Sequence, residues 1–336
     1  YNSKEIRCFS HVHCWQLAGV PVMPTTGEVK GHKGMDAYKS TYSHETEIVK
    51  PGYHKVELDT YQIRVELTST SRVGMHRYTY PAGEKANVLF DVGALLAHGK
   101  TEKAAIHRIS SKEIGGYSVL APTSRRKKPV TVYFVARFNQ NMTAFGGWEK
   151  EGKEKKLVHK NSIEGADIGG YASFGKLKKQ TLLMKVGISY VSEEQARINL
   201  EKELAHWNFD RVKEDAFAEW NRELGKITVE GGSEEEKIKF YTDLWHSLLG
   251  RHTFSDFNGK YIDNTGEEPV VRQVPLDNGT PTRNTYNSDA FWGSEFNLNI
   301  LWSIAYPKVM SEFVSTLVDY YTNGGMLSLI HISEPT

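Results

Sequence analysis

The sequence predicts a multidomain chain of mixed class, in which an antiparallel β-sandwich is followed by helices. Two observations lead to this prediction: short stretches of alternating apolar residues fill the first part, and the spacing becomes helical at Ser192. The length of 336 residues agrees, because a chain of that size exceeds one compact core of ordinary dimensions. We expect a β-sandwich domain over residues 1–191, a helical connector over 192–232 and a helical domain over 233–326.

The strands are predicted by apolar residues at every second position. The clearest case is His54–Leu67, where this alternation continues on both sides of a turn at Asp59–Thr60. Gly, Pro and Asn residues separate the stretches, which is typical of a large antiparallel sandwich. The same pattern predicts further strands at Met75–Tyr80, Ala86–Val92, Pro129–Phe138 and Thr181–Val191.

The helices of the connector are predicted from their capping residues. Ser192 with Gln195 forms a capping-box pattern at the start of a helix that runs to His206. Asp210 is placed to cap a second helix, which ends near Gly225. A short strand is expected at Ile227–Val229.

The helical domain opens with a second capping pattern. Ser233 and Glu236 predict a helix that ends at Gly250. Residues 288–305 and 308–323 are expected to form two more helices, separated at Pro307. The stretch Asp256–Asp263 superficially resembles a calcium loop, but its glycine comes too early, so Asn258–Gly259 predicts a hairpin turn instead.

Composition excludes several classes of function. The formal net charge is +1, and the short basic runs Arg125–Lys128 and Lys153–Lys156 are interpreted as solvated loops. No phosphate loop, CxxC motif or basic stripe is present, so a nucleotide, redox or nucleic-acid function is not expected. No apolar run approaches the ~20 residues of a membrane span. Cys8 and Cys14 would lie about 20 Å apart on one strand, too far for a disulfide between them.

The ends of the sequence predict that it is an internal piece of a longer protein. It starts with Tyr1, and no signal peptide is recognisable. Residues 327–336, L-S-L-I-H-I-S-E-P-T, have no compositional link to what precedes them and look like a translated sequencing adapter. We expect this segment to be an artefact and leave it out of the fold prediction.

The stretch Phe9–Gly27 carries the most distinctive candidate site. His11 and His13 would share one face of an extended strand, and Trp15 follows them. Two imidazoles beside an indole are the chemistry of a sugar or metal pocket. The alternative is a half-buried strand whose histidines are satisfied internally.

A series of motifs runs along the chain in a characteristic order. They are F-S-H-x-H at Phe9–His13, M-P-T-T-G at Met23–Gly27, Y-S-H-E-T-E at Tyr42–Glu47, L-T-S-T-S-R-V-G-M-H-R-Y-T-Y-P at Leu67–Pro81, A-H-W-N-F-D at Ala205–Asp210, W-N-R-E-L-G-K-I at Trp220–Ile227 and F-Y-T-D-L-W-H-S-L-L at Phe240–Leu249. In this order they resemble glycoside hydrolase family 92, the calcium-dependent exo-acting α-mannosidases, over nearly all of residues 1–326. The resemblance implies a β-sandwich joined through helices to an (α/α)6 barrel, of which this truncated chain holds the first helices.

The resemblance also implies a reaction. Family members remove terminal α-linked mannose, as on N-glycans, with inversion. One carboxylic acid protonates the leaving oxygen and a carboxylate activates water from the opposite face, ~6.5–9.5 Å away. Bound Ca²⁺ contacts the mannose hydroxyls. The acid, the base and the calcium ligands are expected beyond Met326, so this chain is expected to hold no catalytic or metal residue and to be inactive alone. Relatives are commonly exported, which implies a secreted or periplasmic location.

Part of the sugar-binding shell is expected within the chain. The family's W-D-T-F-R type block is matched at Asp289–Asn299, where Trp292 stands at the position of the sugar-facing Trp. Gly293 replaces the family's Asp or Asn, and Asp289 or Glu295 could substitute for it. The alternative for Trp292 is a core aromatic.

The resemblance assigns His11, His13 and Trp15 to a pocket between the domains, because family sandwiches contribute loops to the cleft. Two alternatives to an enzyme remain open. One is a non-catalytic carbohydrate-binding module or a decayed mannosidase, in which Gly293 marks a degenerate site. The other is a structural sandwich without a ligand.

Overall fold

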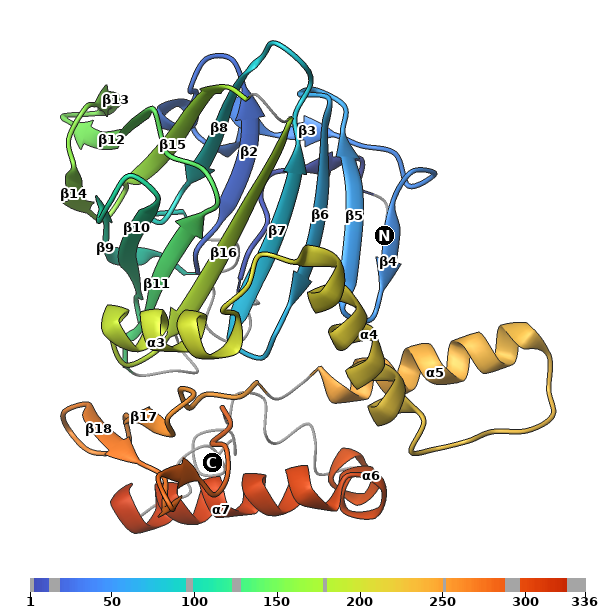
Figure 1. Cartoon of the computed structure of the whole chain (residues 1–336). Coiled ribbons are helices and arrows are strands. Elements are labelled where there is room, and N and C mark those ends of the chain that lie inside the picture. Colours follow the sequence, from blue (N-terminus) through green and yellow to red (C-terminus); the bar gives the residue numbers. More distant parts are fainter. Residues whose placement is uncertain are drawn as a thin grey trace. The chain divides into compact units, whose positions relative to one another are not determined.

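The computed structural model describes residues 3–11, 19–94, 99–122, 128–177, 180–249, 252–287 and 297–324. The chain divides into two compact units, Tyr1–Glu214 (unit 1) and Asp215–Thr336 (unit 2). Figure 1 shows the elements of both units, coloured along the sequence.

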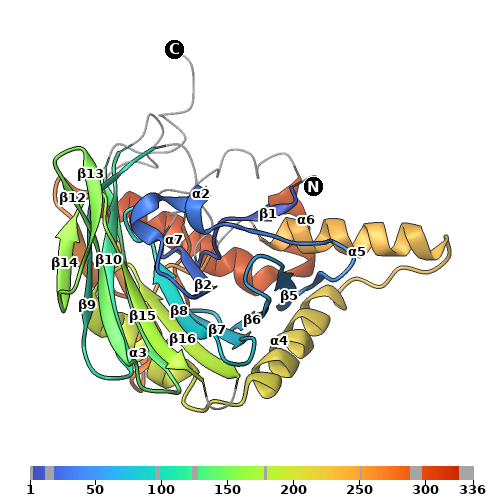
Figure 2. The ribbon, with the colours of Figure 1, turned by 90° about the horizontal axis from the view of Figure 1, so that it is seen from above.

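Unit 1 contains two large sheets in which every neighbouring pair of strands is antiparallel. Figure 2 shows the larger sheet running from β14 and β9 at one edge towards β5 at the other. The nine-stranded sheet contains, in spatial order, β14 (Ser162–Gly165), β9 (Thr101–Arg108), β10 (Glu113–Leu120), β11 (Val130–Phe138), β16 (Thr181–Ser189), β7 (Val73–Thr79), β6 (Ile63–Ser69), β5 (Tyr53–Leu58) and β4 (Ile48–Lys50). The five-stranded sheet contains β13 (Glu154–Val158), β12 (Ala144–Glu151), β15 (Gly169–Lys176), β8 (Lys85–Phe90) and β2 (Val22–Thr26).

The two sheets pack face to face through aromatic side chains. Phe90 of β8 stacks on Phe134 of β11 with the ring centroids 6.0 Å apart. Phe138 of β11 meets Phe174 of β15 edge-on at 4.9 Å. Such contacts between the inner faces of two antiparallel sheets define a β-sandwich, so the predicted fold class of this part is confirmed. Shorter elements lie before and after β2 in the chain: β1 (Glu5–Ile6) paired with β3 (Ser40–Thr41), a 3₁₀ turn at Gly31–Lys33 and α2 (Met35–Tyr38).

Helix α3 (Glu193–Glu203) packs on the nine-stranded sheet. It starts at the predicted residue, with the Ser192 hydroxyl accepting from the Gln195 N–H at 3.1 Å, but the capping box is only half formed because the Gln195 side-chain oxygen has no hydrogen-bond partner. Ala196 and Leu200 of the helix join a buried cluster with Val73 and Val135 of the sheet. The change of period at Ser192 therefore marks a helix whose apolar face covers a sheet.

Two predictions about the following segment are wrong. Helix α4 (Phe209–Leu224) is capped by Asn208, whose side-chain oxygen accepts from the Arg211 N–H at 3.1 Å, whereas Asp210 lies in the first turn. Residues Ile227–Val229 form no strand, because no other segment pairs with them in the described structure. A stretch rich in β-branched residues forms a strand only when another strand pairs with it, and the local sequence does not show whether one does.

Unit 2 begins within α4 and continues with α5 (Glu234–Leu248), which has the complete predicted capping box between Ser233 and Glu236. A turn is present at the expected place, where Gly259 has φ +81° and donates to the Asp256 carbonyl at 2.8 Å, but it joins no hairpin, because β17 pairs with β18 on its other side. The remaining elements are the hairpins β17 (Lys260–Asp263) with β18 (Val270–Gln273) and β19 (Leu276–Asp277) with β20 (Thr280–Pro281), and the helices α6 (Leu298–Ala305) and α7 (Pro307–Gly324).

The core of unit 2 is small. Leu244 of α5 packs with Trp302 of α6 and with Tyr306, and all three are buried. Pro307 is the first residue of α7, where its missing N–H costs no hydrogen bond. Of the helix expected over 288–305, the described part is α6, and residues 288–296 lie outside the described residues.

Candidate functional site

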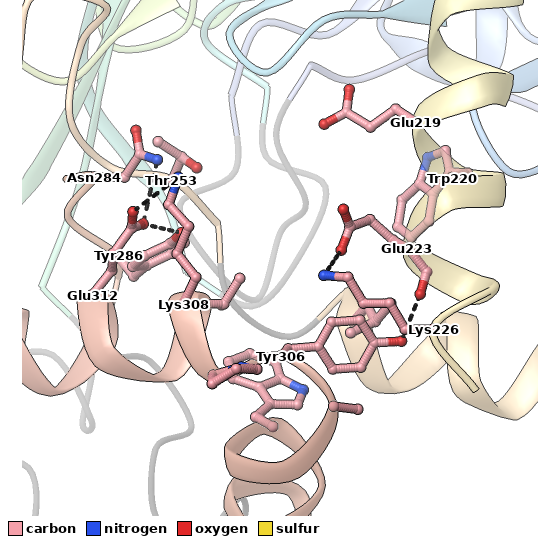
Figure 3. Close-up of a pocket in the computed structure, with 15 residues that line it drawn as sticks. Glu219, Trp220, Glu223, Lys226, Thr253, Asn284, Tyr286, Tyr306, Lys308 and Glu312 are labelled. Atoms are coloured by element: carbon pink, nitrogen blue, oxygen red, sulfur yellow. Dashed lines mark hydrogen bonds and ion pairs between the residues drawn. The ribbon is translucent and has the colours of Figure 1, made fainter. Parts of the chain in front are cut away.

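A cavity of about 620 Å³ lies within unit 2. Its walls come from the C-terminal part of α4, from the junction of α6 and α7, and from the segment around Tyr286 (Figure 3). Volumes of ~300–1,000 Å³ are typical of small-molecule sites.

One wall is organised by the carboxylate of Glu312 on α7. Its Oε2 accepts from the Tyr286 hydroxyl at 2.8 Å and from the Asn284 side-chain amide at 3.4 Å. Its Oε1 lies 4.0 Å from Nζ of Lys308, one turn earlier on the same helix. The Glu312 side chain is only 9% exposed, so a buried acceptor lies at the cavity wall, held by neighbours shown in Figure 3.

The same face of α7 fixes the segment that carries Tyr286. The Tyr286 N–H donates to Thr316 Oγ1 at 3.3 Å, and the Tyr320 hydroxyl donates to the Tyr286 carbonyl at 3.2 Å. Arg283 pairs with Asp319 at 2.5 Å. Because Glu312, Thr316, Asp319 and Tyr320 recur at helical spacing, one stripe of α7 holds this wall.

The opposite wall comes from α4 and the residues after it. Lys226 pairs with Glu223 at 2.5 Å, and its Nζ lies 4.7 Å from the centre of the Tyr306 ring. The Tyr306 hydroxyl donates to the Glu223 carbonyl at 3.0 Å. Burial and the nearby Glu223 raise the pKa of the Tyr306 phenol, so it stays protonated and remains a donor.

Trp220 and Glu219 complete that wall. The Trp220 indole meets Trp245 edge-on, with the ring centroids 6.3 Å apart, and is half-buried. The Glu219 side chain is 63% exposed at the cavity. The cavity therefore combines carboxylate acceptors, an ammonium and an amide donor, and an aromatic surface.

A metal site is not formed by the residues that the structure describes. No group of three or more His, Cys, Asp or Glu side chains among them is arranged to hold an ion. The resemblance places the calcium ligands beyond Met326, so calcium binding stays a prediction.

His11 is the one predicted site residue with described surroundings. Phe9 forms an isolated bridge with Val22 and His11 lies at a bend, so the expected strand does not extend through His11. The bend turns the ring inward, where Nδ1 donates to the Val20 carbonyl at 2.9 Å and Nε2 lies 2.7 Å from Nε2 of His76.

The hydrogen positions in this pair follow from its partners. A carbonyl only accepts, so Nδ1 of neutral His11 carries the proton and Nε2 accepts from His76. His76 Nδ1 then accepts from the Tyr78 hydroxyl at 2.8 Å. Both ring nitrogens of His11 are used within unit 1, as the alternative of internally satisfied histidines expects; a role between domains stays a prediction.

The other predicted site residues lie outside the described residues. They are His13, Trp15, Asp289, Trp292 and Glu295, and Gly293 is outside as well. Their assignment to the sugar-binding shell stays a prediction. The cavity residues were not predicted as site residues from the sequence. Trp220 could have been found, because it opens the motif W-N-R-E-L-G-K-I, whereas no motif marks Glu312, which lies among ordinary charged residues of a helix.

Comparison with known proteins decides the family. The model of the glycosyl hydrolase family 92 N-terminal domain matches residues 1–189, and that of the family 92 catalytic domain matches residues 195–334. The chain belongs to glycosyl hydrolase family 92. The sandwich is thus the N-terminal domain of this family, and the helices that follow are the start of its catalytic domain. The second match includes residues 327–334, and the adapter origin expected for 327–336 stays a prediction. The domain limits 1–191, 192–232 and 233–326 also stay predictions.

Solved structures with the same fold include a family 92 α-mannosidase from Bacteroides thetaiotaomicron, also solved with mannoimidazole. That enzyme is 25% identical, with a TM-score of 0.82 over 96% of this chain and 43% of its own. An inverting family 92 mannosidase from Bacteroides thetaiotaomicron VPI-5482 shares the fold at 21% identity and a TM-score of 0.82, over 97% of this chain and 42% of its own. The chain therefore spans less than half the length of these structures.

A curated relative is an uncharacterised secreted glycosidase of Arthroderma benhamiae. It is 30% identical over 90 residues, which are 26% of this chain and 10% of that protein. Among the described residues, none of the helices has the length and apolar character needed to cross a bilayer.

Proposed function

We propose that this chain is part of a glycoside hydrolase that removes terminal α-linked mannose from mannosides or N-glycans. The observation that carries the proposal is the 25% identity and TM-score of 0.82 to an α-mannosidase over 96% of the chain. The mannoimidazole complex of that enzyme supports a mannose-type substrate. Mannose-containing glycans are the corresponding partners.

The proposal includes inversion at the anomeric carbon. The second Bacteroides relative is an inverting mannosidase, which supports this part. An inverting site needs an acid and a base ~6.5–9.5 Å apart with water between base and sugar. We assign neither role to a described residue of this chain, and calcium assistance rests on the family resemblance alone. A secreted location is supported by the secreted relative, and the alternative of a periplasmic location rests on the family resemblance alone.

The test extends the reading frame and measures mannose release. The source DNA would be sequenced upstream of Tyr1 and beyond Met326, and the extended protein assayed on methyl α-mannoside by proton NMR, with and without calcium. We expect the extended protein to release β-mannose first, because inversion of an α-mannoside gives that anomer. We expect the 336-residue chain to show no turnover.

Three results would overturn the proposal or part of it. If the extended protein releases no mannose, the activity is wrong, and if α-mannose appears first, inversion is wrong. A stop codon directly after Met326 would remove the catalytic half from this gene and leave a carbohydrate-binding module or a decayed enzyme.

A further inference from the structure

We propose that the cavity of unit 2 binds one neutral hexopyranose unit of a mannose-type glycan, with its hydroxyls on Glu312, Glu219 and Lys308 and its C–H face on Trp220. The inference rests on the proposed function only for the kind of sugar. The binding site itself follows from the cavity.

The hydrogen-bonding groups suit a ligand whose hydroxyls both donate and accept. Glu312 already uses Oε2 for Tyr286 and Asn284. At Oε1 the Lys308 ammonium is 4.0 Å away, beyond hydrogen-bond distance. A sugar hydroxyl placed between the two can donate to the carboxylate and accept from the ammonium, which makes both bonds charge-assisted.

The apolar surface suits the other side of the ring. Trp220 is half-buried at the cavity, and its contact with Trp245 is edge-on rather than stacked. An indole face of this kind can cover the C–H face of a pyranose while its own position is fixed by packing. In Figure 3 Trp220 lies on the opposite side of the cavity from Glu312, so the two surfaces face a ligand from two directions.

The walls are held in place before a ligand arrives. Tyr286 is bonded through its N–H, its carbonyl and its hydroxyl to three side chains of α7. A site whose groups are already ordered pays little conformational entropy on binding. Weak ligands such as single sugar units depend on this preorganisation.

The charges select a neutral ligand over an anion. Lys226 is paired with Glu223 and lies over the Tyr306 ring, so its charge is already compensated. Glu219 lies 3.7 Å from the Arg222 guanidinium, and Lys308 lies 4.0 Å from Glu312, so these charges too are compensated by neighbours of opposite sign. A phosphate or sulfate would have to compete with these carboxylates for the cations, whereas the hydroxyls of a neutral sugar can bond to both signs of charge.

Binding would be measured on the intact 336-residue chain with methyl α-mannopyranoside as the probe. Saturation-transfer NMR gives the dissociation constant, and indole fluorescence reports on Trp220. We expect saturable binding, a fluorescence change that Trp220→Phe abolishes, and no binding of inorganic phosphate at the same concentrations.

Three variants locate the sugar. Glu312→Gln keeps the shape of the side chain and is expected to weaken binding about tenfold or more, since it removes a charged acceptor. Glu219→Gln and Lys308→Met are expected to weaken it about threefold to tenfold. Their side chains are 63% and 88% exposed, so both variants should fold even if Glu312→Gln does not. Glu235→Gln, an exposed acid of α5 away from the cavity lining, is the matched control and should bind like the parent.

Three outcomes would overturn the inference. They are the absence of saturable mannoside binding, equal affinity in the parent and in both Glu219→Gln and Lys308→Met, and phosphate binding in place of the sugar. None of them depends on hydrolysis. A failure here therefore differs from a failure of the mannose-release assay, which uses the extended protein.

Discussion

The two units differ in how completely they cover their apolar side chains. In the described part of unit 1 the exposed large hydrophobic residues are Ile48, Val49 and Ile109. In unit 2 they form a long series: Phe217, Ile238, Leu249, Phe257, Val270, Val271, Leu276, Ile300, Ile304, Val314, Val318 and Tyr321. Isolated exposed apolar residues are ordinary, but so many on a small unit indicate faces made for contact.

In unit 1, charged side chains connect α3 and the residues after it to the nine-stranded sheet through ion pairs and hydrogen bonds. Glu203 of the helix accepts from the Arg72 guanidinium at 2.6 Å and from the Thr70 hydroxyl at 2.6 Å. Lys185 of β16 donates to the Leu204 carbonyl at 2.8 Å and lies 4.1 Å from the centre of the Trp207 ring. Burial lowers the pKa of Lys185 to about 8. The sandwich therefore covers most of its own apolar side chains, whereas unit 2 exposes apolar faces that its own described residues leave uncovered.

The largest expected effect tests the closed core of unit 1. Phe134 is fully buried and stacks on Phe90, so Phe134→Ala removes packing from both sheets. We expect a loss of about 3–5 kcal/mol in the free energy of unfolding. Urea unfolding gives this value, and hydrogen exchange assigns it to unit 1. The matched change in unit 2, Val318→Ala, should stay within about 0.5 kcal/mol, because Val318 is 56% exposed. Equal losses of stability in the two variants would contradict the conclusion that unit 1 buries its apolar side chains more completely than unit 2.

The sequence predicted the sandwich where each strand shows its own alternation. β5 and β6 appear on both sides of the expected turn, within His54–Leu67. Strands such as β10 and β15 were not predicted, because each contains a Gly-Gly pair that local reasoning assigns to a loop. In the structure a Cβ on Gly116 would lie 2.0 Å from the Ala105 carbonyl oxygen. Glycine is therefore required by a close approach between strands, which a single segment cannot reveal.

The candidate site was predictable to a smaller extent. Glu312 and Trp220 line the same cavity although their helices are distant in the sequence. No local sequence pattern predicts that the two side chains meet there. His11 was found from its motif, but its inward turn to Val20 and His76 depends on a bend that spacing does not encode. Motifs identified the family, whereas tertiary packing decided the direction of each side chain.

The second effect concerns acid stability, which we expect to be controlled by unit 1. Burial lowers the pKa of His11 to about 4 and holds the pKa of His76 well below its ordinary value. Because the folded state disfavours the charged form, the stabilisation is complete above the unfolded pKa of ~6.5 and is lost as the pH falls towards 4. For His11 alone the expected loss is about 3 kcal/mol across this window. Thermal unfolding between pH 7 and about 4 measures it.

A control separates this effect from an opposing one. Burial raises the pKa of Asp91 to about 6, so its contribution is present below ~3.8 and is lost as the pH rises through 6. Asp91→Asn removes that opposing slope, and the loss of stability with acid should then become steeper. His11→Gln should flatten the acid limb. An unchanged pH profile in His11→Gln would show that the histidine pair does not control acid stability.

The smallest expected effect on stability tests the uncovered face of unit 2. Ile304 of α6 is 79% exposed, so Ile304→Lys removes little packing and should change the free energy of unfolding by less than about 0.5 kcal/mol. The same change breaks an apolar surface and should raise the concentration at which the chain starts to self-associate, measured by light scattering. Ser303→Lys, at a neighbouring exposed position without an apolar side chain, is the control for added charge. If Ile304→Lys costs more than about 1.5 kcal/mol, the residue packs against other parts of the chain and the face is already covered. If both variants improve solubility equally, net charge rather than the exposed apolar face limits the solubility of unit 2.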